Sequence, residues 1–94
     1  MKETVYIDWN NEIVCSEKNR EANIESMARD LQNYEENDEG EEIFEGMLEE
    51  YSAIDLFTMN DNEKGDLWTR FCRECHNRAE ENFNEDFETV EVDV

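Results

Sequence analysis

Residues 4–15 read TVYIDWNNEIVC: an alternating pattern of apolar and polar residues is assigned to 4–8, and an extended pattern resumes over 13–15 after WNNE. Asparagine tolerates the positive φ that tight hairpin turns require, so this stretch predicts a β-hairpin. The side chains expected on its buried face are Val5, Ile7 and Ile13. An isolated hairpin is only marginally stable, so a further strand is needed to complete a sheet.

The end of the chain supplies that strand. Its last eight residues, FETVEVDV, alternate with period two, which predicts a strand over about 87–93. Val90, Val92 and Val94 then lie on one side of it. Because the hairpin lacks another partner, the two ends of the chain are expected to pair in one sheet.

Apolar residues at helical spacing fill the chain between these strands. Gly40 is expected to separate the first two helices, and Ser52 with Asp55 resembles a capping box. The expected helices span about 17–34, 41–51, 52–58 and 61–82. The sequence therefore predicts a single α+β domain over residues 1–94. It is a three-stranded antiparallel sheet, made of the N-terminal hairpin and the C-terminal strand, packed with three to four helices.

The chain is unusually acidic. It holds 28 Asp and Glu against 8 Lys and Arg, a net charge of -20 on 94 residues. Residues 30–63 contain thirteen acids and no base, and residues 79–94 contain seven acids and no base. Such crowding of like charge destabilises a compact state. It excludes nucleic acid and anionic membranes as partners of the acidic faces, and it favours a basic protein.

The spacing of these acids predicts a partner-binding surface. In the second helix, acids four residues apart rise by about 6 Å per step, and in the last strand Glu91 and Asp93 are about 6.6 Å apart. Both spacings are of the order of the distance between successive phosphates of a nucleic acid. Such a row can occupy a Lys/Arg channel built for DNA. The candidate partner-binding residues are Glu35, Glu36, Asp38, Glu39, Glu41, Glu42, Glu45, Glu49, Glu50, Glu91 and Asp93.

A simpler interpretation is a solvated face that only keeps the protein soluble. A surface with that role usually intersperses both signs of charge, whereas residues 30–63 carry one sign alone. Tyr34 and Tyr51, at the edges of the acidic region, are candidate aromatic anchors for a partner.

The stretch CRECH, residues 72–76, holds two of the three cysteines and the only histidine. CxxCH is the attachment signature of c-type haem, but this copy falls deep inside an expected helix. A thioredoxin-like CxxC needs its first cysteine at a helix N-terminus, which this position does not provide.

Two interpretations of CRECH remain open. Cys72, Cys75 and His76 stand at i, i+3 and i+4 of a helix and converge on one side, and Cys15 completes a Cys₃His set that suits structural zinc. Alternatively, Cys72 and Cys75 are small buried residues of an apolar stripe. Zinc is the one cofactor that the sequence suggests.

No catalytic constellation is apparent, since the chain has one histidine, no phosphate-binding glycine loop and carboxylates throughout. The protein is therefore expected not to be an enzyme. The N-terminus lacks a secretory signal and no stretch is apolar enough for a membrane span. We expect a cytoplasmic protein whose thiols stay reduced.

The hairpin YIDWNNEIV and runs such as EENDEGEEIFEGMLEE, in a short acidic α+β chain, resemble small phage and mobile-element anti-defence proteins. Anti-CRISPR proteins that act on type II effectors are the most similar group. The resemblance lies in size, charge and composition along the whole chain. It implies a non-enzymatic inhibitor, active in the bacterial cytoplasm, that binds a basic surface of a CRISPR nuclease and blocks DNA or guide loading. The alternative is a zinc-stabilised acidic regulatory or adaptor module.

Overall fold

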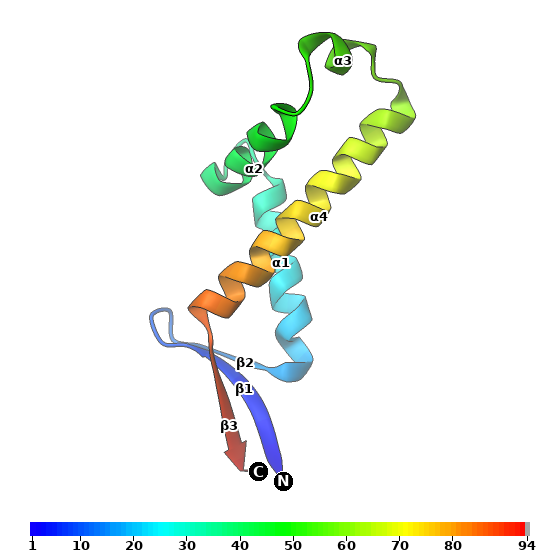
Figure 1. Ribbon diagram of the computed structural model, residues 1–94. Coiled ribbons are helices and arrows are strands. Elements are labelled where there is room, and N and C mark those ends of the chain that lie inside the picture. Colours follow the sequence, from blue (N-terminus) through cyan, green and yellow to red (C-terminus); the bar gives the residue numbers. More distant parts are fainter. Residues whose placement is uncertain (94) are drawn as a thin grey trace.

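The structure, a computed structural model, describes residues 1–93. Its elements, in chain order, are β1 (Lys2–Asp8), β2 (Ile13–Ser16), the 3₁₀ turn η1 (Glu17–Asn19), α1 (Arg20–Gln32), α2 (Asp38–Leu48), α3 (Ala53–Thr58), α4 (Asp61–Asp86) and β3 (Glu88–Asp93). The strands form one antiparallel sheet in the order β2-β1-β3 (Figure 1). The predicted α+β fold, with a hairpin completed by the C-terminal strand, is confirmed.

The pairing of the strands fixes which side chains face the helices. Tyr6 stands opposite Cys15 on β2 and Thr89 on β3. Its ring meets Phe83 of α4 edge-on at 5.4 Å between ring centroids. Cys15 is buried beside it in the core. The helix-facing side of the sheet is therefore the side of Tyr6.

This orientation corrects the predicted buried face of the hairpin. Val5 and Ile7 alternate with Tyr6 along β1 and so lie on the outer face, where Ile7 pairs with Val14 and Val5 with Val90. Ile13 is 44% exposed. The prediction was wrong because β1 carries apolar side chains on both faces, so alternation alone does not select one. Val90 and Val92 do share the outer face, as their spacing predicts, while Val94 lies outside the described residues.

The turn of the hairpin is built around Asp8, the one buried acidic residue among those described. Its carboxylate accepts hydrogen bonds from the backbone N–H groups of Asn10 and Asn11 at 3.1 and 3.2 Å, and from Asn11 Nδ2 at 2.8 Å. The hydrogen bond from the Asn11 side chain lowers the pKa of Asp8 below its usual value. The positive φ of the turn, 56°, falls on Glu12 rather than on an asparagine.

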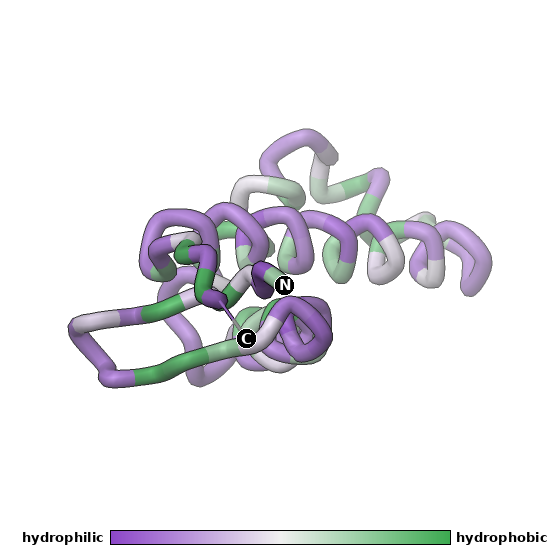
Figure 2. Tube along the Cα trace, turned by 90° about the horizontal axis from the view of Figure 1, so that it is seen from below, coloured by the Kyte–Doolittle hydropathy of each residue, from purple (hydrophilic) through white to green (hydrophobic). Residues whose placement is uncertain are grey.

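The core lies mainly between α1 and α4, which cross near the middle of the molecule (Figure 1). The tubes of the helices in Figure 2 are mostly purple, because each contributes only a narrow apolar stripe. Phe71, Cys75, Ala79 and Phe83 repeat at four-residue steps along α4 and are fully buried. The other buried apolar residues are Cys15, Ile24, Ala28, Leu31 and Met47.

α2 begins earlier than its pattern suggests, at Asp38 instead of residue 41. Asn37 caps it by accepting a hydrogen bond from the Gly40 N–H at 3.0 Å, and acids in the first turn suit the positive end of the helix. Gly40 was expected to separate the first two helices. It lies inside α2 instead, in close contact with the backbone of Leu31. The break falls at residues 33–37 instead.

The molecule is long, with principal extents of 58 × 24 × 17 Å. α4 has 26 residues, which corresponds to a length of about 39 Å. The sheet and both ends of the chain lie at one end of the molecule, and α3 lies at the other (Figure 1). Within residues 1–93, none of the helices combines the length and apolar character needed to cross a membrane.

Candidate functional site

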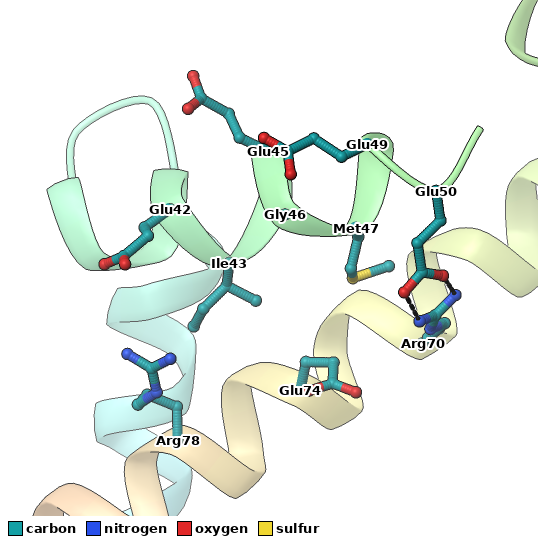
Figure 3. A pocket seen from close by; sticks show the side chains of 10 residues that line it. All are labelled: Glu42, Ile43, Glu45, Gly46, Met47, Glu49, Glu50, Arg70, Glu74 and Arg78. Atoms are coloured by element: carbon teal, nitrogen blue, oxygen red, sulfur yellow. Dashed lines mark hydrogen bonds and ion pairs between the residues drawn. The ribbon is translucent and has the colours of Figure 1, made fainter. Parts of the chain in front are cut away.

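The acids of α2 form a regularly spaced charged surface. Gly40 and Met47 are buried, and Ile43 and Phe44 pack against the core, so the acids on the other side of the helix face solvent. We define the α2 acidic face as Glu41, Glu42, Glu45 and Glu49, all exposed. Glu45 points away from α4 and Glu49 runs along α2 toward Glu45, whereas Ile43 and Met47 point toward α4 (Figure 3).

Two arginines of α4 hold α2 near both of its ends. Arg78 Nη1 lies 3.2 Å from Glu39 Oε1 in the first turn of α2, and Asn82 donates to the same oxygen at 3.0 Å. Just beyond the last turn, Arg70 makes two contacts with the Glu50 carboxylate at 2.6 and 2.9 Å (Figure 3). Hydrogen bonding to Arg70 lowers the pKa of Glu50. Glu39 and Glu50 are thus occupied within the protein.

The α2 acidic face is not occupied in this way. Across residues 1–93, its four side chains take part in neither a hydrogen bond nor an ion pair. Four carboxylates therefore remain free on a helix whose position is fixed by packing, by Asn37 and by the two arginines. This arrangement can supply several charge-assisted contacts to a basic partner with little further ordering of its backbone.

Two hollows border this face. One, of about 510 Å³, lies between α2 and α4 (Figure 3). Its lining includes Ile43 and Met47, three acids of the α2 acidic face, and Arg70 and Arg78. The other, of about 400 Å³, lies on the opposite side of α2 and is lined by Tyr34, Glu35, Glu41, Phe44, Glu45 and Leu48. The second hollow combines an apolar floor with carboxylates, which suits the aliphatic stem and cationic head of a Lys or Arg side chain.

The other predicted partner-binding acids are dispersed. Glu35, Glu36 and Asp38 are exposed around the turn that precedes α2, and Glu36 accepts a hydrogen bond from Asn33 at 3.2 Å. Glu91 and Asp93 lie on β3, at the sheet end of the molecule. Glu91 lies 4.0 Å from Lys2. The structure therefore separates the strand acids from the α2 acidic face.

The predicted aromatic anchors are only partly available. The ring of Tyr34 stacks on Phe44 at 4.1 Å between centroids, so one of its faces is covered. Tyr51 is partly buried and lines a hollow with Arg70. Sequence reasoning missed the arginine contacts altogether, since no local pattern relates residues of α4 to the ends of α2.

The cysteines occupy three different environments. Cys75 is fully buried in the core, and burial raises the pKa of its thiol to about 11. Burial also raises the pKa of Cys15, whose Sγ accepts from Asn23 at 3.1 Å and lies 3.2 Å from the Ser16 carbonyl oxygen. Cys72 is partly exposed and lines a hollow with His76.

These environments bear on the suggested zinc site. Thiolates are the form that binds zinc, and two of the three thiols have raised pKa values. Among the residues that the structure describes, no three His, Cys, Asp or Glu side chains are grouped to hold a metal ion. His76 instead lies 3.8 Å from Glu21. The Cys15, Cys72, Cys75 and His76 site therefore stays a prediction of the sequence.

Comparison with known proteins adds no relative: no protein-family model, curated protein or solved structure matches this chain. The α2 acidic face is therefore the feature of the molecule that points to a function.

Proposed function

We propose that this protein is a non-enzymatic inhibitor that uses the α2 acidic face to bind a basic, nucleic-acid-handling bacterial enzyme. The observation that carries the proposal is the set of four free carboxylates on one firmly packed helix. Glu41, Glu45 and Glu49 follow at four-residue steps, with Glu42 beside the row. A cleft that binds the phosphates of DNA through Lys and Arg offers the complementary charge.

The target that fits the resemblance in size and charge is a CRISPR nuclease of type II. Its positively charged channel, which holds nucleic acid by the backbone, would accept carboxylates in place of phosphates and so lose access to DNA or guide. The hollow beside Tyr34 and Phe44 supports the proposal by offering a place for one partner Lys or Arg. Such an apolar hollow adds the short-range specificity that charge alone does not give.

The test is charge reversal on the helix. We expect the triple variant Glu42→Lys, Glu45→Lys, Glu49→Lys to weaken binding to the nuclease by at least about a hundredfold, because each lost contact of this kind costs about 1.5–3 kcal/mol. Binding is measured by surface plasmon resonance, and inhibition by DNA cleavage. All three side chains are exposed, so the substitutions should leave the fold intact, and circular dichroism checks this.

A matched control distinguishes an effect of the α2 acidic face from an effect of the overall negative charge. Glu25→Lys, Asp30→Lys, Glu85→Lys changes the net charge equally at three exposed sites on α1 and α4. Retained binding by the control together with loss in the test variant supports the proposal. Equal loss in both would show that only overall charge matters, and unchanged binding of the test variant would refute the assignment. Competition by duplex DNA tests whether the occupied surface is a DNA-binding one.

The second candidate is a zinc-stabilised adaptor, in which the acidity serves solubility. It is favoured only by the i, i+4 placement of Cys72 and His76 along one hollow. Elemental analysis of the purified protein tests it, and a stoichiometric zinc content would support it.

A further inference from the structure

The end of the molecule opposite the sheet is apolar and uncovered. We call residues 51–73 the tip: the segment after α2, the whole of α3 and the first half of α4. Phe57 is 90% exposed, Ile54 74% and Trp68 48%. α3 contributes no buried residue, and the first buried residue of α4 is Phe71. Ile54 and Phe57 stand three residues apart on α3 and so share one side of the helix. Exposed apolar side chains of this size mark a surface for association.

These side chains are held in place by regular structure. Ser52 and Asp55 form a reciprocal capping box at the start of α3, with hydrogen bonds of 3.1 and 3.2 Å. Asn60 caps α4 by accepting from the Glu63 N–H at 2.9 Å. The capping box predicted from the sequence is thus confirmed. A tip built from two capped helices presents its apolar residues in fixed positions, which reduces the entropy cost of association.

The elongated chain exposes more surface than a compact chain of the same mass. Its radius of gyration is 17.1 Å, against about 12–13 Å for a compact domain of this length. Its accessible surface is 6951 Å², whereas a monomer of this mass averages about 5,700 Å². The difference exceeds the ~800 Å² per partner that a stable protein–protein interface buries.

The net charge of the tip indicates which partner can bind there. The tip holds four acids, Asp55, Asp61, Glu63 and Asp66, against three bases, Lys64, Arg70 and Arg73, which gives a net charge of -1. The rest of the chain therefore carries -19 of the total of -20. A basic partner is attracted to that remainder, not to the tip. Each copy carries -20 in total, so two copies repel least when they approach through their nearly neutral tips. The mixed signs of the tip allow charge pairing across a twofold axis.

We propose that two copies of this protein associate through their tips, burying Ile54, Phe57 and Trp68 of each copy in a twofold interface. The α2 acidic face of each copy lies outside the tip and stays available. The inference is independent of the proposed inhibitory function, because it involves a different surface and a different partner.

The test is the mass of the full chain in solution, measured by analytical ultracentrifugation from micromolar to millimolar concentration. We expect the mass to rise from 11.3 kDa to twice that value and to persist in molar NaCl, since the interface is apolar. Phe57→Asp should weaken dimerisation by about thirtyfold or more, the loss typical of a central aromatic anchor. Because Phe57 is so exposed in the single chain, the fold of the variant should survive, as circular dichroism can check.

The matched control is Val14→Asp, which adds the same charge at a 67% exposed position on the sheet. We expect Val14→Asp to dimerise normally. A second readout uses Trp9→Phe, which leaves Trp68 as the sole tryptophan, and its emission should shift to the blue as concentration rises. A monomer at millimolar concentration would overturn the proposal. So would dissociation caused by Val14→Asp but not by Phe57→Asp, which would place the interface on the sheet.

Discussion

Arg70 and Arg78 engage the acids near the two ends of α2. Both ion pairs are partly exposed, with side-chain exposures of 38% and 55% for Arg70 and Glu50 and of 38% for both Arg78 and Glu39. Exposed pairs of this kind contribute little to stability, because water and salt screen them. Their larger effect is positional: they fix the ends of α2 against α4, and the side chains of the α2 acidic face take no part in these contacts.

The three cysteines differ in burial and should therefore differ in their reactivity toward thiol reagents. In the native protein at neutral pH, we expect a thiol reagent such as Ellman's to modify Cys72 rapidly and Cys15 and Cys75 only as the protein unfolds. Burial protects the latter two and raises their pKa values, so little thiolate is present. The measurement is the number of thiols that react in the fast phase, with and without denaturant.

The control for this experiment is Cys72→Ala, which should remove the fast phase entirely. Two or three fast thiols in the native protein would contradict the burial described above. A bound zinc would give a distinct result: no fast thiol until a chelator is added. The same titration therefore tests the metal site that the sequence suggests.

At the scale of elements, the contact between α1 and α2 depends on Gly40. A methyl group at this position would overlap the carbonyl oxygen of Leu31, a backbone atom that cannot move aside without shifting α1. We expect Gly40→Ala to lower the free energy of unfolding by about 1–3 kcal/mol, as overpacked sites do. Urea denaturation measures the change.

Gly46, on the same helix, is the matched control, because a methyl group there meets nothing within 4 Å. Gly46→Ala should raise the free energy of unfolding by about 0.5–1 kcal/mol through helix propensity alone. Equal effects of the two substitutions would mean that Gly40 is not a close-packing position.

The elements also show how far the sequence could predict this structure. Strand and helix types follow from periodicity, and the caps at Ser52 and Asn60 follow from local residue chemistry, so these were predictable. The orientation of the hairpin was not, because Val5, Tyr6 and Ile7 form a continuous apolar run. The start of α2 was misplaced because Gly40 was expected to break the helix, whereas it is needed for a contact with α1.

The candidate site, like the fold, was predictable from the sequence only in part. That α2 would carry exposed acids was predictable, since its apolar stripe defines the opposite face. Which of those acids are free was not, because the arginines that occupy Glu39 and Glu50 come from distant positions in the chain. The isolation of the strand acids from α2 likewise depends on the length of α4.

For the molecule as a whole, the net charge of -20 opposes folding through self-repulsion, which salt screens. We expect added NaCl to raise the melting temperature by about 4–8 °C, equivalent to about 1 kcal/mol for a domain of this size. The measurement is thermal denaturation followed by circular dichroism. Over the same range of salt, the proposed complex with a basic enzyme should weaken.

The control is the triple variant Glu42→Lys, Glu45→Lys, Glu49→Lys, which has six fewer net negative charges. Its melting temperature should respond less to salt than that of the unmodified protein. A melting temperature that falls with NaCl would show that attractive ion pairs, not repulsion, dominate the electrostatics of the free chain.

The pairing of Lys2 with Asp93 has a consequence for the order in which the chain assembles. β1 and β2 meet across a four-residue turn, whereas β1 and β3 meet only after the whole helical segment has returned. Closing so long a loop carries a large entropic penalty and slows folding. We therefore expect the β1–β3 ladder to form after the rate-limiting step, with mutations in β3 accelerating unfolding and leaving the refolding rate almost unchanged.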